Sequence, residues 1–149
     1  MKYKVNEIQI SYREKISTLK SASMKNSEDV ANLLFRNWDT ANIGLRETFK
    51  ILLLNNANKV KGISSLSIGG ITGTMVDIRI LFAIVLKTLS VGIILAHNHP
   101  SGKLQPSTAD KELTFKIVKA AKLLDVKVLD HIIITPKKQY FSFADNGLL

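Results

Sequence analysis

Residues 93–110 read Ile-Ile-Leu-Ala-His-Asn-His-Pro-Ser-Gly-Lys-Leu-Gln-Pro-Ser-Thr-Ala-Asp. The four apolar residues at the start are typical of a short buried strand, which would carry His97 and His99 at its end. Pro100 and Gly102 then turn the chain, and the clearest helical pattern of the sequence begins at Ser107. A strand, a turn and a helix in this order predict an α/β protein with a functional site at the strand end.

Apolar periodicity predicts further elements on both sides of this stretch. Residues 47–55 and 60–66 read as a hairpin, because Asn55 to Asn58 supply turn residues between two apolar runs. Residues 77–89 are apolar enough for a helix buried on most sides. The other expected elements are a loose strand at 5–12, a helix that opens at Ser27, a helix with a lysine-rich outer face from Ser107, a strand at 126–135 and a last strand at 140–143.

The bulk composition limits the class of protein. A chain of 149 residues with 46% hydrophobic residues fits one domain, in which residues 1–45 supply a strand and a helix packed on residues 46–149. The absence of cysteine excludes disulfides, thiolate nucleophiles and cysteine-ligated metals. The N-terminus lacks a signal-peptide core, and the longest apolar run, 80–86, is too short to cross a membrane. We therefore expect a cytoplasmic protein without a membrane partner.

The two histidines of His97-Asn98-His99 have the spacing of metal ligands. Side chains at positions i and i+2 of an extended segment point the same way, so both imidazoles can reach one ion. Asp110, in the first turn of the next helix, can fold back and add an oxygen ligand. Two nitrogens and one carboxylate leave an open position for water, as in catalytic zinc sites, although the same set also fits iron oxygenases.

Hydrolysis at such a site requires a further carboxylate as a proton shuttle. We select Glu47, because it opens a strongly buried strand where a charged side chain has no evident packing role. Ser107 has two interpretations: with Asp110 it can form a helix capping box, or its hydroxyl can stabilise an oxyanion. His131 lies in an apolar segment and is interpreted as a hydrogen-bonded structural residue.

The string His-Asn-His-Pro-Ser-Gly, with seven residues between His99 and Ser107 and then Ser-x-x-Asp, resembles the signature of the JAB/MPN (JAMM) metalloprotease superfamily, in its bacterial RadC-like branch. Asp130-His131 and residues 141–145 are also similar to that branch, so the resemblance covers about residues 47–149. It implies a mixed sheet flanked by helices, similar to cytidine deaminases. It also implies one Zn²⁺ per chain at His97, His99 and Asp110, Glu47 as general acid/base, and Ser107 as the oxyanion-stabilising hydroxyl.

The resemblance leads us to expect a peptidase or isopeptidase. Asn98 departs from the eukaryotic deubiquitinating members, which have Ser or Thr there, so ubiquitin is not the implied substrate. Residues 1–45 lack the Gly-rich hairpins of longer RadC proteins and resemble the short stand-alone forms.

The alternative is an accessory protein of DNA repair with a structural or vestigial metal site. The net charge of +9, from 21 basic and 12 acidic residues, favours anionic partners such as nucleic acid. The sequence leaves homo-oligomerisation open.

Overall fold

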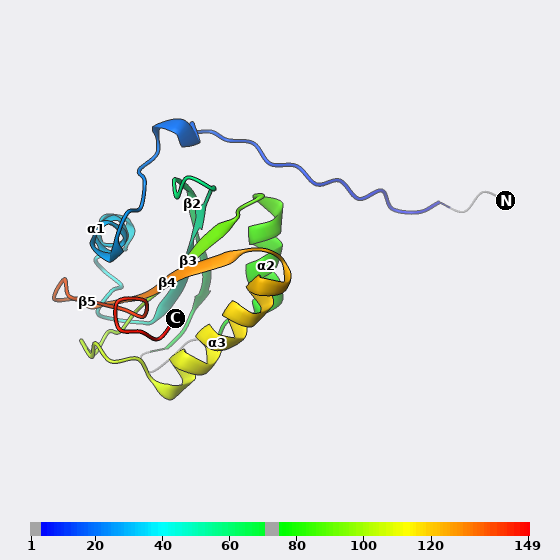
Figure 1. Cartoon of the computed structure of the whole chain (residues 1–149). Helices are drawn as coiled ribbons and strands as arrows, with labels where there is room; N and C mark the ends of the chain where they lie inside the picture. Colours follow the sequence, from blue (N-terminus) through cyan, green and yellow to red (C-terminus); the bar gives the residue numbers. More distant parts are fainter. Residues whose placement is uncertain (1–3, 71–74) are drawn as a thin grey trace.

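The structure of the chain is a computed structural model that describes residues 4–70 and 75–149. Five strands form one mixed sheet in the order β2-β1-β3-β4-β5, with helices on both faces (Figure 1). The α/β class and the mixed sheet predicted from the sequence are confirmed. The elements are η1 (Thr18–Lys20), α1 (Ser27–Asn37), β1 (Thr48–Leu54), β2 (Val60–Ile68), α2 (Ile78–Lys87), β3 (Gly92–Asn98), α3 (Thr108–Leu123), β4 (Lys127–Ile134) and β5 (Tyr140–Ser142).

The predicted hairpin forms between β1 and β2, which pair antiparallel. Its turn is held by the Asn55 side chain, which accepts hydrogen bonds from the backbone N–H groups of Ala57 and Lys59. Asn58 takes a positive φ of 56°, which asparagine tolerates better than most residues. On its other edge β1 pairs antiparallel with β3, and β3 pairs parallel with β4 after the α3 crossover.

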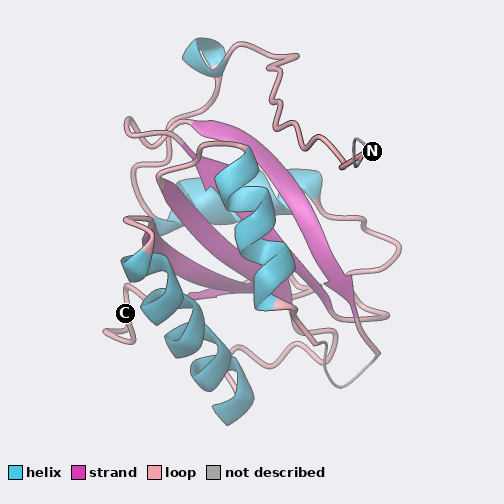
Figure 2. Ribbon diagram, turned by 90° about the vertical axis from the view of Figure 1, so that its right-hand side faces the viewer, coloured by secondary structure: helices cyan, strands magenta, loops and turns pink. Residues whose placement is uncertain are grey.

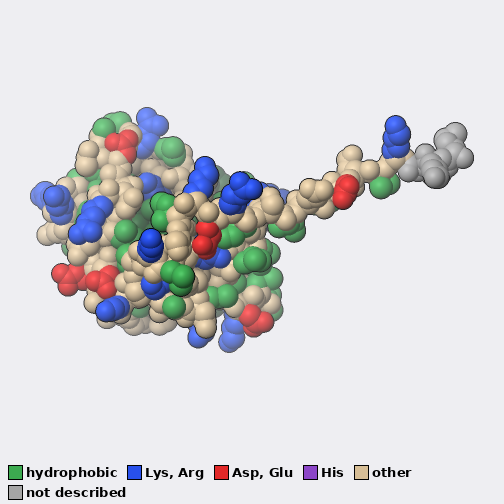
Figure 3. Space-filling view, turned by 90° about the horizontal axis from the view of Figure 1, so that it is seen from above, with side chains coloured by type: hydrophobic (Ala, Val, Ile, Leu, Met, Phe, Trp, Pro, Cys, Tyr) green, Lys and Arg blue, Asp and Glu red, His purple; other side chains and the backbone are tan. Residues whose placement is uncertain are grey.

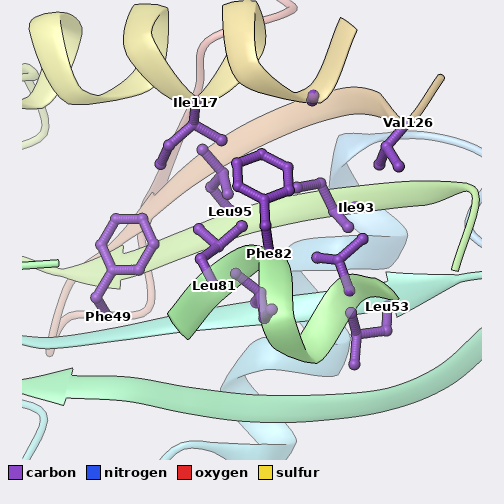
Figure 4. Close-up of a cluster of buried hydrophobic side chains, with 11 residues drawn as sticks. Phe49, Leu53, Leu81, Phe82, Ile93, Leu95, Ile117 and Val126 are labelled. Carbon is purple, nitrogen blue, oxygen red and sulfur yellow. The ribbon is translucent and has the colours of Figure 1, made fainter. Parts of the chain in front are cut away.

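Helices lie on both faces of the sheet (Figure 2), and one hydrophobic cluster lies on each face. On one face, α2 and α3 cover Phe49, Ile51 and Leu53 of β1 and the inward residues of β3, a packing drawn in Figure 4. On the other face, α1 packs over alternate residues of the central strands. Both faces of β1 and β3 are therefore buried, which explains why these strands read as continuous apolar runs.

Strand alternation decides where the polar residues at the end of β3 lie. Ile93 and Leu95 belong to the cluster under α2 and α3, so His97 points to that face. Ile94 and Ala96 belong to the cluster under α1, so Asn98 points to the opposite face. Adjacent polar residues of one strand are thus placed on different sides of the sheet.

The strand expected at residues 5–12 is wrong. Residues 4–17 contain no strand, are exposed throughout, and extend away from the sheet (Figures 1 and 3). Val5 and Ile8 are each 87% exposed, so ordering this segment on the domain would bring little burial to offset the lost chain entropy. The N-terminal helix does form, with Asn26 rather than Ser27 as its N-cap.

The expectation that residues 77–89 are buried on most sides is also wrong, although the helix itself, α2, is confirmed. Leu81, Phe82 and Val85 are buried against the sheet, whereas Ile80 and Leu86 are about half exposed. The reason is that α2 lies in an outer layer, with the sheet on one side only. Within residues 4–70 and 75–149, no helix has the length and apolar content needed to cross a bilayer.

Candidate metal centre

Glu47, His97, His99 and Asp110 converge at one point, as the sequence predicted. Each offers one ligand atom, and these four atoms all lie within 4.8 Å of one another. Glu47 directly precedes β1, His97 lies in β3, His99 follows that strand, and Asp110 stands in the first turn of α3. The site therefore lies where the end of β3, the start of β1 and the N-terminus of α3 meet.

The distances within the group are short enough for its donors to share one metal ion. His97 Nε2 lies 2.9 Å from His99 Nε2 and 3.4 Å from Asp110 Oδ1. His99 Nε2 lies 3.3 Å from Asp110 Oδ2, and Glu47 Oε1 is farther out, 3.8 Å from His97 Nε2. Tetrahedral ligands at a zinc–nitrogen distance of about 2.0–2.1 Å stand about 3.3 Å apart. A nitrogen and oxygen set with this spacing fits zinc.

The Asp110 carboxylate is shared between the histidines and the start of α3. Ser107 Oγ accepts a hydrogen bond from the Asp110 N–H at 3.0 Å, and Asp110 Oδ2 accepts one from the Ser107 N–H at 2.8 Å. This is a capping box, so the structural interpretation of Ser107 and Asp110 is correct and coexists with the site. Burial opposes ionisation of Asp110, but its interactions with the neighbouring His97 and His99 outweigh this effect and lower its pKa.

The orientation of His99 is fixed by the loop between β3 and α3. Its Nδ1 lies 2.6 Å from the Lys103 carbonyl oxygen, which can only accept a hydrogen bond. We therefore assign the proton to Nδ1, which leaves the Nε2 lone pair facing the site. Burial favours the neutral ring, but the contacts with Asp110 and Lys103 outweigh this effect and raise the pKa of His99.

Glu47 is held by its backbone and buried at its side chain. Its N–H donates to the Gly70 carbonyl at 3.0 Å, and its carbonyl accepts from the Gly69 N–H at 2.7 Å. The residue is only 7% exposed. Burial raises the pKa of Glu47, and the nearby His97 and His99 offset part of that rise. A carboxyl whose pKa is raised in this way holds a proton more readily than an exposed glutamate and can pass it on.

Asn98 holds the Glu47 segment, a function that the sequence analysis missed. Its side chain is completely buried. Its Oδ1 accepts from the Thr48 N–H at 2.8 Å, and its Nδ2 donates to the carbonyls of Ile43 and Arg46 at 2.7 and 2.9 Å. Two of these three bonds lie on either side of Glu47. The sequence does hold a signal for this role. Strand alternation places the residue between His97 and His99 on the face of the sheet opposite to the two histidines.

His131 is buried and hydrogen-bonded, as expected of a structural residue, but its partner is a residue of the site itself. Its Nε2 lies 2.7 Å from His97 Nδ1. Phe143 stacks on His131 with ring centroids 4.5 Å apart. The sequence analysis missed this link because β3 and β4 are distant in sequence and become neighbours only through the α3 crossover.

Comparisons with known proteins show the family of the chain. The family described as the RadC-like JAB domain matches residues 24–148, so the chain belongs to this family. The match begins ahead of residue 46 and includes α1. Similar proteins are a UPF0758 protein of Flavobacterium johnsoniae, 55% identical over 102 residues (68% of this chain, 44% of that protein), and one of Porphyromonas gingivalis, 45% identical over 104 residues (70% and 46%).

The UPF0758 protein YeeS of Escherichia coli is 42% identical over 116 residues, which cover 76% of this chain and 78% of YeeS. The matched regions cover a little under half of the Flavobacterium and Porphyromonas relatives.

The hydrogen bonds of Asn98 lead to a first prediction. Asn98→Ala leaves three backbone groups of the segment 43–48 without their partner, and a buried polar group without a partner costs about 1–3 kcal/mol. We expect the free energy of unfolding to fall by about 3 kcal/mol in urea denaturation with EDTA present. Asn37→Ala is the control, because the exposed Asn37 side chain donates only to the Leu33 carbonyl. If Asn98→Ala loses no more stability than Asn37→Ala, the side chain of Asn98 does not hold the Glu47 segment.

The burial of Glu47 leads to a pH prediction for the metal-free protein. Its pKa is raised above the ordinary 4.5, so protonated Glu47 favours the folded state. This contribution is complete below the unfolded-state pKa and is lost as the pH rises through the folded-state pKa. Glu47→Gln cannot lose a proton there. The stability advantage of Glu47→Gln over the wild type, measured by urea denaturation, should therefore grow as the pH rises above the ordinary glutamate pKa of 4.5. An advantage that stays constant or shrinks contradicts the shift.

Proposed function

We propose that this chain is a zinc-dependent metallohydrolase of the JAMM type, which cleaves peptide or isopeptide bonds. The observation that carries the proposal is the meeting of two histidines and an aspartate with a separate, buried glutamate at the end of β3. Three ligands and one independent carboxylate form the set that metal-assisted hydrolysis requires. The RadC-like JAB match supports the same assignment. We also propose a cytoplasmic location, which the absence of cysteine supports.

His97, His99 and Asp110 would hold the zinc ion. Bound there, zinc supplies a Lewis acid that lowers the pKa of water and polarises the carbonyl under attack. The first task of the protein is to aim both imidazoles at the same point. For His99 the Lys103 carbonyl does this, because it accepts the Nδ1 proton and so turns Nε2 towards the site. Asp110 is ionised readily, and the capping box fixes its carboxylate at the start of α3.

Glu47 would transfer the proton. It stands 3.8 Å from His97 Nε2, farther than Asp110, so of the two carboxylates it is the one suited to act beside the ion rather than on it. Because its pKa is raised, Glu47 is suited to take a proton from the attacking water and to pass it to the leaving nitrogen. The hydrogen bonds of Asn98 to the backbone on both sides of Glu47 support a fixed position for this transfer.

Ser107 would stabilise the oxyanion. Its Oγ accepts from the Asp110 N–H, and among the described residues no acceptor takes its hydroxyl proton. That proton is therefore available to the oxygen on which negative charge develops. The N-terminus of α3, with its positive dipole end, adds to the same effect.

The second candidate, a nucleic-acid-binding accessory protein, is favoured by the net charge of +9. On the face in Figure 3, however, Lys and Arg are scattered among neutral and acidic side chains rather than gathered in one stripe. We therefore place hydrolysis first.

The test compares the zinc-loaded wild type with Glu47→Gln, His97→Ala and a control, Glu112→Gln, which makes the same chemical change on an exposed residue of α3. We expect Glu47→Gln to keep about one zinc per chain and to lose at least about 100-fold in the cleavage of a peptide and isopeptide library. His97→Ala should lose the zinc as well, and Glu112→Gln should match the wild type.

Full activity in Glu47→Gln would remove the proposed mechanism. No cleavage by the zinc-loaded wild type, together with duplex binding that weakens steeply with salt, would favour the accessory protein instead.

A further inference from the structure

A chain of three hydrogen bonds runs behind His97, on the side away from the site. Thr114 Oγ1 donates to the Asp110 carbonyl at 2.7 Å and lies 2.6 Å from His131 Nδ1. His131 Nε2 in turn lies 2.7 Å from His97 Nδ1. His97, Thr114 and His131 are 1%, 2% and 0% exposed, so water cannot substitute for any of these partners.

The direction of each bond follows from the carbonyl at its end. A carbonyl oxygen only accepts, so the single hydroxyl proton of Thr114 points to Asp110. His131 Nδ1 must then donate to the Thr114 oxygen, which makes Nε2 of a neutral His131 an acceptor. His97 Nδ1 must therefore carry the proton donated to His131, and its Nε2 is left with a lone pair towards Glu47, His99 and Asp110.

We propose that Thr114 and His131 are positioning residues that fix the tautomer of His97, so that its Nε2 presents a lone pair to the metal. The inference rests on the metal site of the proposed function. A ligating histidine commonly gives its other N–H to a carboxylate or a backbone carbonyl. Here a neutral imidazole takes that place, and its own tautomer is set by a threonine hydroxyl.

Aromatic rings keep both imidazoles in the planes that this chain requires. Phe49 stacks on His97 with centroids 6.0 Å apart and 9° between the planes, and Phe143 stacks on His131 at 4.5 Å and 14°. A ring flip within the same plane would put carbon atoms in place of the nitrogens and so break the hydrogen bonds between His97, His131 and Thr114. The hydroxyl of Thr114 is thus the element that selects between the two tautomers.

This chain of hydrogen bonds through Thr114 and His131, the relay, also connects a nitrogen ligand with an oxygen ligand. Thr114 donates to the backbone carbonyl of Asp110, whose carboxylate faces His97 and His99. One turn of α3 therefore orients an oxygen ligand at one end of the relay and a nitrogen ligand at the other. Moving Thr114 would disturb both.

The experiment replaces Thr114 in the full chain. Thr114→Val keeps the shape and removes the hydroxyl, so His131 Nδ1–H loses its acceptor and the opposite tautomer becomes accessible. Thr114→Ser keeps the hydroxyl. Thr88→Val is the matched control, because Thr88 Oγ1, at the C-cap of α2 and outside the site, makes the same kind of bond to the Ile84 carbonyl at 2.9 Å.

Two readouts are combined: zinc affinity by competition with a chromophoric chelator, and imidazole tautomers by ¹⁵N-edited NMR of the metal-free protein. We expect Thr114→Val to bind zinc about 10- to 100-fold more weakly, whereas Thr114→Ser and Thr88→Val stay within about threefold of the wild type. The wild-type spectrum should show the proton of His131 on Nδ1 and a protonated Nδ1 in His97.

Wild-type zinc affinity in a folded Thr114→Val variant, or a proton on Nε2 of His131 in the wild type, would overturn the proposal. If Thr114→Val does not fold, the wild-type spectrum and the affinity of Thr114→Ser decide the matter. If the wild type binds no zinc, the proposed function is wrong. The imidazole tautomers in the spectrum of the metal-free protein would still test the relay. Zinc binding without peptide cleavage would leave the relay intact and remove only the proposed reaction.

Discussion

The site depends on one pairing in the sheet, in which Phe49 of β1 lies opposite His97 of β3. This register sets Glu47, two residues ahead of Phe49, beside the imidazole pair. A slip by one residue would turn every side chain of the strand to the other face. The buried Asn98 secures the pairing at its end, because it bonds to the backbone on both sides of Glu47. β1 and β3, which form the centre of the hydrophobic core, therefore also bring Glu47 to the site.

Several residues serve the fold and the chemistry at once. Ser107 and Asp110 cap α3, and the same carboxylate faces both imidazoles. Thr114 bonds back to the helix and at the same time orients His131. A buried site built in this way has few spare degrees of freedom, which is what a preorganised catalytic centre requires. It also means that a loss of activity on mutation has to be separated from a loss of folding.

The sequence was sufficient for the parts of the site that lie close together along the chain. The i, i+2 spacing of His97 and His99 and the capping pattern of Ser107 and Asp110 are local, and the structure brings these residues together. Glu47 was found by the unusual burial expected for a charge at a strand start. Asn98 and His131 were assigned no part in the site, because Asn98 bonds to the segment 43–48 and His131 bonds to β3 and α3. Only the tertiary pairing reveals these partners. The strand expected at 5–12 failed because an alternating pattern does not by itself provide a neighbouring strand.

X-ray absorption at the zinc edge of the purified full chain tests directly whether the imidazole pair binds the ion. We expect about one zinc per chain with two imidazole nitrogens at about 2.0–2.1 Å and oxygen in the remaining positions. A protein that binds no zinc, or a bound zinc whose spectrum lacks imidazole scattering, would contradict it.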